Sequence, residues 1–387
     1  MRSRPVPWTR TDSAANQTRC RRIRPDQQIA AYVSPTYFDV IEKRRTQLMT
    51  EVLSRGAVSG LGPRLLGISP RRTSSAGSRL LVWRFGDGER SVMLFGARDT
   101  NPPRPNADEH APKLVGGMVR GLGNLESKVG MVQAFFACSA IAEQYGVAAL
   151  DGVTVVMVSG DASGSGLSPA LIEEEVQGHR AVLALSPSGP GGALTIARPG
   201  SANYAVDICV QGEDAAFELA EKICSITALS TAALGTSVVV TGGQTVPVLS
   251  RIPVNERLSV EVRARSVDEL ERVDSVLRSL RPAVGGTVIR VSGGRERVPM
   301  HIGSSAELFM LACRSARALD LPEPDGLSLD EASYANVAAE LGFPTLDGLG
   351  APRVDKISAE LRVDADCLVG RTALLAKMID TLARTGR

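Results

Sequence analysis

Three carboxylates stand where catalytic or metal-binding groups occur in α/β proteins. Asp99 and Asp161 each follow a short apolar run of the strand type, and Glu126 lies near the start of a predicted helix. Because ligands of open α/β sheets bind beyond the carboxyl ends of the strands, we expect the three side chains to converge there. Such a cluster suits general acid–base catalysis or a hard cation. The alternative, which the residues alone favour, is that the two aspartates cap turns.

Other groups that carry out catalysis are scarce in this sequence. The glycine- and serine-rich loop 160–166 lacks the Gly-Lys-Ser/Thr ending of a phosphate-binding loop, so it is better explained as a tight βα turn. No G-x-S-x-G sequence occurs, which argues against a serine hydrolase. His110, His179 and His301 have no histidine or carboxylate at ligand spacing. We expect all three to be surface or loop residues.

The composition excludes several classes of function. The chain has 387 residues, 43% hydrophobic and 22% charged, as expected for a globular protein of two domains. Its net charge of +2 comes mostly from arginines in the first 24 residues, and aromatic residues make up 4%, so we expect no nucleic-acid partner. No apolar run is long enough to span a membrane. The six cysteines include no C-x-x-C pair, so we expect reduced thiols and a cytoplasmic protein.

The order of predicted elements indicates an α/β fold with an inserted unit. Residues 1–35 are polar and arginine-rich without periodicity, so we expect a disordered basic extension. Alternating strand and helix patterns predict an α/β domain of the catalytic type over 36–200 and 304–387. Between its two parts, 201–303 shows the order β-α-β-β-α-β, which is typical of a ferredoxin-like domain.

Seven motifs occur in a recognisable order on these elements. They are Gly-x-x-Asp-Thr at 96–100, Gly-x-Gly-x-x-Glu-x-Lys-x-Gly at 121–130, Ala-Arg-Pro-Gly at 197–200, Thr-Gly-Gly at 241–243, Val-Glu-Val-Arg at 260–263, Gly-Gly-Arg-Glu-Arg-Val-Pro-Met at 293–300 and Leu-Gly-Phe-Pro-Thr-Leu-Asp-Gly-Leu-Gly at 341–350. With them, the chain from about residue 40 resembles the zinc-dependent exopeptidases and deacylases: carboxypeptidase G-type glutamate carboxypeptidase, acetylornithine deacetylase and succinyl-diaminopimelate desuccinylase. The resemblance implies a zinc-aminopeptidase-like α/β/α domain with an inserted ferredoxin-like lid that dimerises.

The same resemblance implies that the metal site has been lost. The family uses two zinc ions and a glutamate base that activates the metal-bound water. Its ligand positions fall on Ala97, Glu126, Ala162, Ser186 and, in a looser alignment, Ile357. The base falls on Asp161, and Asp99 is left without the ligand histidine that it orients in the family. Since most of these side chains cannot bind zinc, we expect no metal cofactor.

The positions that contact substrate in the family are better preserved. Arg263 matches the lid arginine that clamps a substrate carboxylate, and Arg297 leads back from the lid. Ser333 and Asn336 match a Ser-x-x-Asn motif of the active-site region. A guanidinium fork suits a carboxylate, although an exposed arginine on an edge strand is an equal alternative.

These observations leave three hypotheses about function. The first is a metal-independent, repurposed enzyme, of specialised metabolism for instance, that acts on a small carboxylate-bearing amide or amino-acid-like substrate. Asp161 would be its general acid or base, assisted by Glu126 or Asp99. The second is a still-active zinc amidohydrolase or carboxypeptidase with rearranged ligands. The third is a non-catalytic partner or regulatory subunit that uses the lid for assembly. The sequence identifies neither the substrate nor the pathway.

Overall fold

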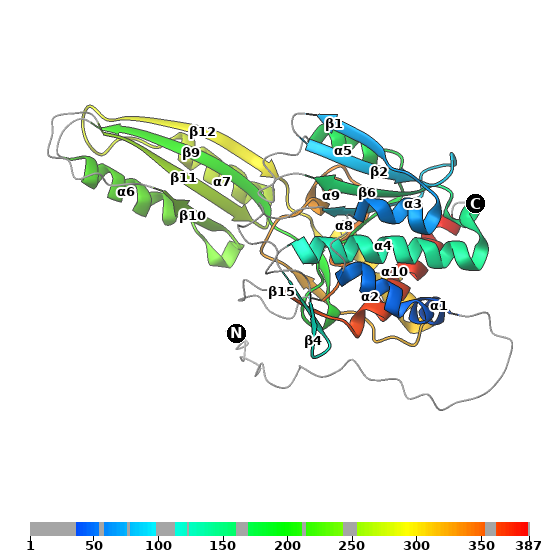
Figure 1. Cartoon of the computed structure of the whole chain (residues 1–387). Coiled ribbons are helices and arrows are strands. Elements are labelled where there is room, and N and C mark those ends of the chain that lie inside the picture. The colour runs from blue at the N-terminus through cyan, green and yellow to red at the C-terminus, as the bar shows by residue number, and fades with distance from the viewer. Residues whose placement is uncertain are drawn as a thin grey trace, which may run out of the picture.

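The computed structural model describes residues 36–53, 58–75, 78–97, 113–121, 124–159, 169–210, 214–242, 254–352 and 361–385. Figure 1 shows two units: an α/β unit, and an antiparallel unit formed by residues 200–297 that extends away from it. We call residues 200–297 the lid. This arrangement confirms the predicted fold class.

A six-stranded sheet forms the centre of the α/β unit. In spatial order its strands are β1 (Arg71–Ser75), β2 (Ser78–Arg84), β6 (Val153–Ser159), β3 (Val92–Ala97), β7 (Ala181–Ala184) and β14 (Thr345–Leu346). The last four run parallel to one another, whereas β1 and β2 form an antiparallel edge. The central strands are apolar on both faces because helices cover both sides of the sheet.

Two layers of helices enclose this sheet. On one face lie α4 (Asn124–Tyr145) and α10 (Cys367–Arg384), with α1 (Tyr37–Lys43), α2 (Arg45–Leu53), α3 (Leu61–Leu66) and α8 (Ile302–Ala318) around them. On the other face lie α5 (Pro169–Val176) and α9 (Ala335–Glu340). Successive side chains of β3 point to opposite faces of the sheet. Leu94 therefore packs in the core with α4, and Phe95 packs in the core with α5 and α9. The helical run from Tyr37 to Leu53 is broken at Arg44 into α1 and α2.

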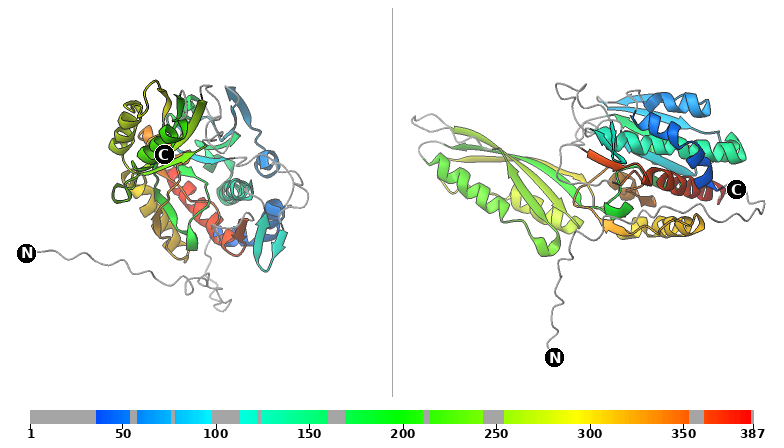
Figure 2. Two further views of the ribbon diagram at one scale, coloured as in Figure 1. Left: turned by 90° about the vertical axis from the view of Figure 1, so that its left-hand side faces the viewer. Right: turned by 60° about the horizontal axis from the view of Figure 1, so that its bottom comes forward.

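The lid is a four-stranded antiparallel sheet with two helices on one face (Figure 2). Its elements are β9 (Gly200–Val210), α6 (Ala215–Thr227), β10 (Ser237–Thr241), β11 (Val254–Ala264), α7 (Val267–Arg278) and β12 (Val288–Arg297), and its strand order is β10-β11-β9-β12. Buried side chains such as Val206 and Val260 point toward the helices, and the opposite face carries polar side chains such as Asp207 and Arg257. The predicted ferredoxin-like topology is therefore confirmed.

Smaller elements complete the α/β unit. A three-stranded sheet consists of β4 (Lys113–Val115), β5 (Met118–Gly121) and β15 (Leu361–Asp364). Beside the lid, β8 (Leu194–Ala197) pairs with β13 (Gly326–Ser328). None of the helices in the described ranges is long and apolar enough to cross a membrane.

Candidate functional site at the carboxyl edge of the sheet

The parallel strands β3, β6, β7 and β14 all end at one edge of the sheet. Helix α4 begins on this side, and Figure 1 shows that its first residues lie toward the lid. The chain enters and leaves the lid beside the same edge, where Arg198 and Met300 form a two-way backbone bridge. Ligands of open α/β sheets bind at this edge, so it is the candidate functional site.

A buried ion pair lies at this edge, after the outermost strand β14. Asp347, directly after β14, is fully buried and accepts a hydrogen bond from Nε of Arg198 at 2.8 Å. It also accepts bonds from the Ser333 hydroxyl at 2.9 Å and from the Gly348 backbone N–H at 2.6 Å. Burial raises the pKa of Asp347, but the charge of Arg198 and the hydrogen bonds outweigh it, so the pKa lies below its usual range.

The hydroxyl of Ser186 also bonds to Asp347. Ser186 follows β7, and its hydroxyl stabilises the buried carboxylate of Asp347. Ala97, at the end of β3, has no donor atom in its side chain. Among the described residues no group of three or more His, Cys, Asp or Glu side chains comes together as a metal site.

A partly buried arginine stabilises the loop next to Asp347. Arg371 of α10 donates to the carbonyl oxygens of Gly348 and Gly350 at 2.6 and 3.1 Å, and to that of Gly192 at 2.7 Å. Burial lowers the pKa of Arg371 to about 10, which still leaves it charged at neutral pH. Gly350 in turn donates its backbone N–H to the carbonyl of Ser186. Arg371 thus indirectly supports both Asp347 and Ser186.

Ser333 and Asn336 lie at this edge and are bonded to the protein itself. The Asn336 side-chain amide donates to the carbonyl oxygens of Pro199 at 2.9 Å and Val298 at 2.8 Å. These two residues lie on the two segments, 198–199 and 298–300, that connect the lid to the α/β unit, and we call these segments the lid crossings. The side-chain carbonyl oxygen of Asn336 accepts from the Ser333 backbone N–H at 2.8 Å. Both residues therefore hold the lid crossings in place, and their role toward a substrate stays a prediction.

The two candidate arginines differ in what surrounds them. Arg263 forms an ion pair with Glu261 at 2.6 Å and donates to the backbone carbonyl of Asp330 at 3.1 Å. The guanidinium of Arg297 lies over the ring of Tyr334, 4.9 Å from its centre, and has no carboxylate partner within the described ranges. Of the two, Arg297 is the cation with hydrogen-bonding capacity left for an anionic ligand.

The catalytic candidates stay predictions. Asp99, Asp161, Ala162 and Ile357 lie outside the described residues. Glu126 lies in the first turn of α4, at the expected edge, but the structure does not describe its side chain.

Three residues of this site were not predicted from the sequence. Arg198, Asp347 and Tyr334 were given no role, although Arg198 and Asp347 lie within motifs that carried the resemblance. Asp347 could have been found from the sequence, because it is a charged residue directly after a short strand-forming segment. His179, expected at the surface or in a loop, is 3% exposed and bonds to Thr154 at 2.9 Å. His179 lies in the loop between α5 and β7, as expected, and its contacts with α5 and β6 bury it there.

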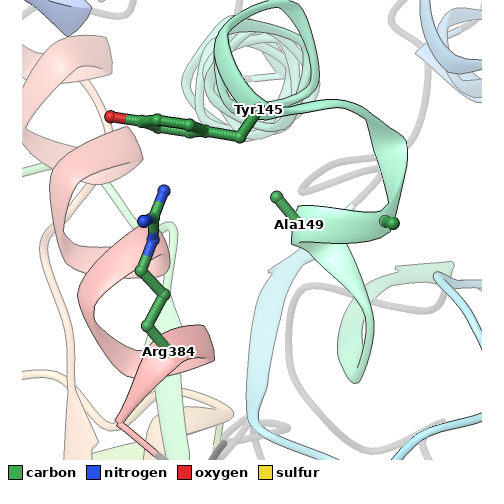
Figure 3. Close-up of a pocket in the computed structure, with 4 residues that line it drawn as sticks. Tyr145, Ala149 and Arg384 are labelled. Carbon is green, nitrogen blue, oxygen red and sulfur yellow. The ribbon is translucent and has the colours of Figure 1, made fainter.

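A hollow of about 360 Å³ lies at the opposite edge of the sheet (Figure 3). It is lined by Tyr145, Ala148, Ala149 and Arg384, from the end of α4, the short helix η2 (Val147–Leu150) and α10. The Arg384 guanidinium lies 4.1 Å from the centre of the Tyr145 ring. Because Tyr145 ends α4, the hollow lies away from the carboxyl edge and is not the candidate site.

Comparison with solved structures shows which proteins share this fold. A tripeptidase from Staphylococcus aureus matches with a TM-score of 0.65 and 15% identity over 88% of this chain and 99% of its own. An M20-family metallo-carboxypeptidase from Sulfolobus solfataricus matches with a TM-score of 0.61 and 12% identity, over 89% and 99%. A dinuclear metal-binding M20 peptidase from Bacillus subtilis matches with a TM-score of 0.56 and 13% identity, over 89% of this chain and 99% of its own. No protein-family model and no curated protein sequence matches this chain. The fold is thus that of M20 peptidases across nearly the whole chain.

Proposed function

We propose that this chain is an M20-type fold that works without a dizinc centre and binds a small carboxylate-bearing amide or amino-acid-like molecule at the carboxyl edge of the sheet. The observation that carries the proposal is the state of Arg297. It lies beside the lid crossing on the ring of Tyr334, and the described chain offers it no carboxylate. A planar guanidinium in this setting can bind a carboxylate through two parallel hydrogen bonds.

The metal-free part of the proposal is supported by side-chain chemistry. Ala97 offers no donor, and the Ser186 hydroxyl is already bonded to Asp347. A neutral hydroxyl in such a bond is a weak zinc ligand compared with a carboxylate or imidazole. No step of the mechanism is therefore assigned to a metal ion.

The chemistry would come from carboxylates at the same edge. Asp161 is the proposed general acid or base, with Glu126 or Asp99 assisting it, and Arg297 or Arg263 orients the substrate carboxylate. Holding an amide next to a carboxylate base converts an encounter in solution into a positioned reaction.

Metal content tests the first part of the proposal. The full chain is incubated with excess zinc, dialysed and analysed by elemental mass spectrometry. We expect well below one zinc ion per chain, and no change in the thermal unfolding midpoint on adding a chelator. Close to two zinc ions per chain would overturn the proposal and support the zinc amidohydrolase instead.

Ligand binding tests the second part. N-acyl amino acids, each paired with its uncharged amide, are titrated against the wild type, Arg297→Gln and Arg295→Gln. Arg295 is an exposed arginine on the same strand and is the matched control. We expect the carboxylates to bind the wild type and Arg295→Gln, and to lose affinity for Arg297→Gln by roughly tenfold or more, as for a charge-assisted hydrogen bond. Equal binding of acids and amides would overturn the carboxylate site.

We also propose that a second copy of the chain docks on the lid. The lid exposes the large apolar side chains Phe217, Leu234 and Val239, and the last of these lies on the edge strand β10. An unpaired edge strand beside exposed apolar side chains is suited to pairing with another strand. Light scattering should give a dimer for the wild type and a monomer for Val239→Lys. A monomeric wild type would contradict this, and a stable hetero-complex would favour the regulatory-subunit hypothesis.

A further inference from the structure

Three side chains from distant parts of the chain contact one another in a row at the candidate site. The ring of Phe95, at the end of β3, meets the ring of Tyr334 edge-on at 5.7 Å between centres, with the ring planes at 77°. The Arg297 guanidinium, from the end of β12, lies over the same tyrosine ring at 4.9 Å. The tyrosine is thus in contact with both a buried aromatic residue and the candidate carboxylate-binding arginine.

The backbone on both sides of Tyr334 is held by side chains. The Ser333 hydroxyl donates to Asp347 and accepts the backbone N–H of Ala335 at 3.1 Å. Asn336 accepts the Ser333 N–H and donates to both lid crossings. With its neighbours bonded in this way and its ring against Phe95, Tyr334 forms a fixed surface.

Arg297 differs from the other arginines that lie between the lid and the α/β unit. Arg198 pairs with Asp347, Arg263 with Glu261, and Arg265 with Asp330 at 3.0 Å. Arg297 instead contacts an aromatic face. An aromatic face attracts a cation through its positive charge, so the contact does not use hydrogen bonds from the N–H groups of the guanidinium. The contact therefore holds the guanidinium in place while leaving its N–H groups available for a ligand.

We infer that Tyr334 is a positioning residue for carboxylate binding: its ring holds the guanidinium of Arg297 in place at the candidate site, with the N–H groups available to the ligand. The inference rests on the proposed function, in which Arg297 receives the ligand carboxylate. Because the ring makes the contact with Arg297, phenylalanine should keep this contact and an aliphatic residue should lose it. The position thereby selects for ligands that offer a planar carboxylate rather than an amide or a hydroxyl.

Chemical modification tests the stack without any ligand. Phenylglyoxal reacts with arginine side chains, and peptide mass spectrometry follows its rate at Arg297 in the full chain, with the exposed Arg295 as the internal reference. We expect Tyr334→Leu to raise the relative rate at Arg297 by roughly two- to fivefold, the factor that corresponds to an exposed cation–π contact. Tyr334→Phe should leave the rate unchanged. Equal rates in the wild type and Tyr334→Leu would overturn the inference.

Ligand affinity then tests whether the stack serves binding. N-acetyl-L-alanine and its uncharged amide are titrated by calorimetry against the wild type, Tyr334→Phe and Tyr334→Leu. We expect the acid to bind the wild type and the Phe variant equally, and the Leu variant several-fold more weakly. Equal binding of the acid to the Phe and Leu variants would overturn the positioning role. If the acid does not bind the wild type, the carboxylate site fails, and the modification rates still decide whether Tyr334 holds Arg297.

Discussion

Arg198 and Asp347 form a buried ion pair across 149 residues of sequence, with Nε and Oδ2 2.8 Å apart. Arg198 is 5% exposed and Asp347 is not exposed at all. The pair connects the chain that enters the lid to the strand end of β14, and Arg198 also donates to the backbone carbonyl of Glu331 at 2.7 Å. This contact holds the lid crossing against the candidate site.

Removing the negative partner should destabilise the fold strongly. We expect Asp347→Asn to lower the free energy of unfolding by about 3–5 kcal/mol, because it leaves the Arg198 charge buried and uncompensated. Urea unfolding measures the loss. The matched control is Asp207→Asn on the lid surface, where the partner Arg257 is 67% exposed. This substitution should lower the free energy of unfolding by about 1 kcal/mol or less. Similar losses in the two variants would contradict a special role for the buried pair.

The same carboxylate makes stability depend on acid pH. Because the pKa of Asp347 is lower in the folded chain than in the unfolded chain, its contribution is complete above the unfolded value near 3.9. It is lost as pH falls through the lower, folded value. We therefore expect the difference in unfolding free energy between the wild type and Asp347→Asn to be constant from pH 7 to about 5 and to shrink below about pH 4. A difference that stays constant to pH 2 would contradict this.

Asn336 should determine how firmly the lid is attached. Asn336→Ala removes the two hydrogen bonds to the carbonyls of Pro199 and Val298, so we expect a loss of about 1–3 kcal/mol. Backbone amide exchange near Arg198 and Met300 should rise with it. Asn203, exposed on the lid strand β9, is the matched control, and Asn203→Ala should change neither quantity. Unchanged exchange at the crossings in Asn336→Ala would refute the role.

His179 should stay neutral far below the usual range for histidine. Burial lowers the pKa of His179 to about 4, and its ring bonds to the Val176 carbonyl and the Thr154 hydroxyl. Since the unfolded chain takes up this proton near pH 6.5, the stability from the neutral ring is complete above that value. It is lost as pH falls from about 6.5 toward 4. NMR titration of the ring, assigned with His179→Asn, measures the pKa, and a midpoint near 6.5 would contradict the structure.

Two cysteines should differ sharply in reactivity. Burial raises the pKa of the Cys138 thiol to about 12, whereas Cys224 is exposed on the lid helix α6. Because the thiolate is the reacting form, iodoacetamide at neutral pH should label Cys224 in the native chain and Cys138 only after unfolding. Peptide mass spectrometry with and without urea checks this. Equal native labelling of the two thiols would show that α4 is less enclosed than the structure has it.

Much of the fold follows from local patterns. The apolar run of β6 is buried on both faces, and the alternating run of β9 is buried on one, as their sequences predict. The order of strands and helices in 200–297 was sufficient for the lid topology. The break between α1 and α2 was not predictable, because it depends on Arg44, which bonds to Ser139 of α4 and lies over Phe136. A local sequence pattern carries no information about such contacts between residues that are far apart in the sequence.

The sequence by itself determined that Ala97 has no donor for a metal ion and that cationic side chains flank the lid. Only the tertiary structure decided which of these cations are already paired. Arg198 and Arg263 have carboxylate partners, and Arg297 has an aromatic ring. The physical reason is distance: charges and hydrogen bonds act over a few ångströms, and the folded chain brings together residues as far apart in sequence as Arg198 and Asp347.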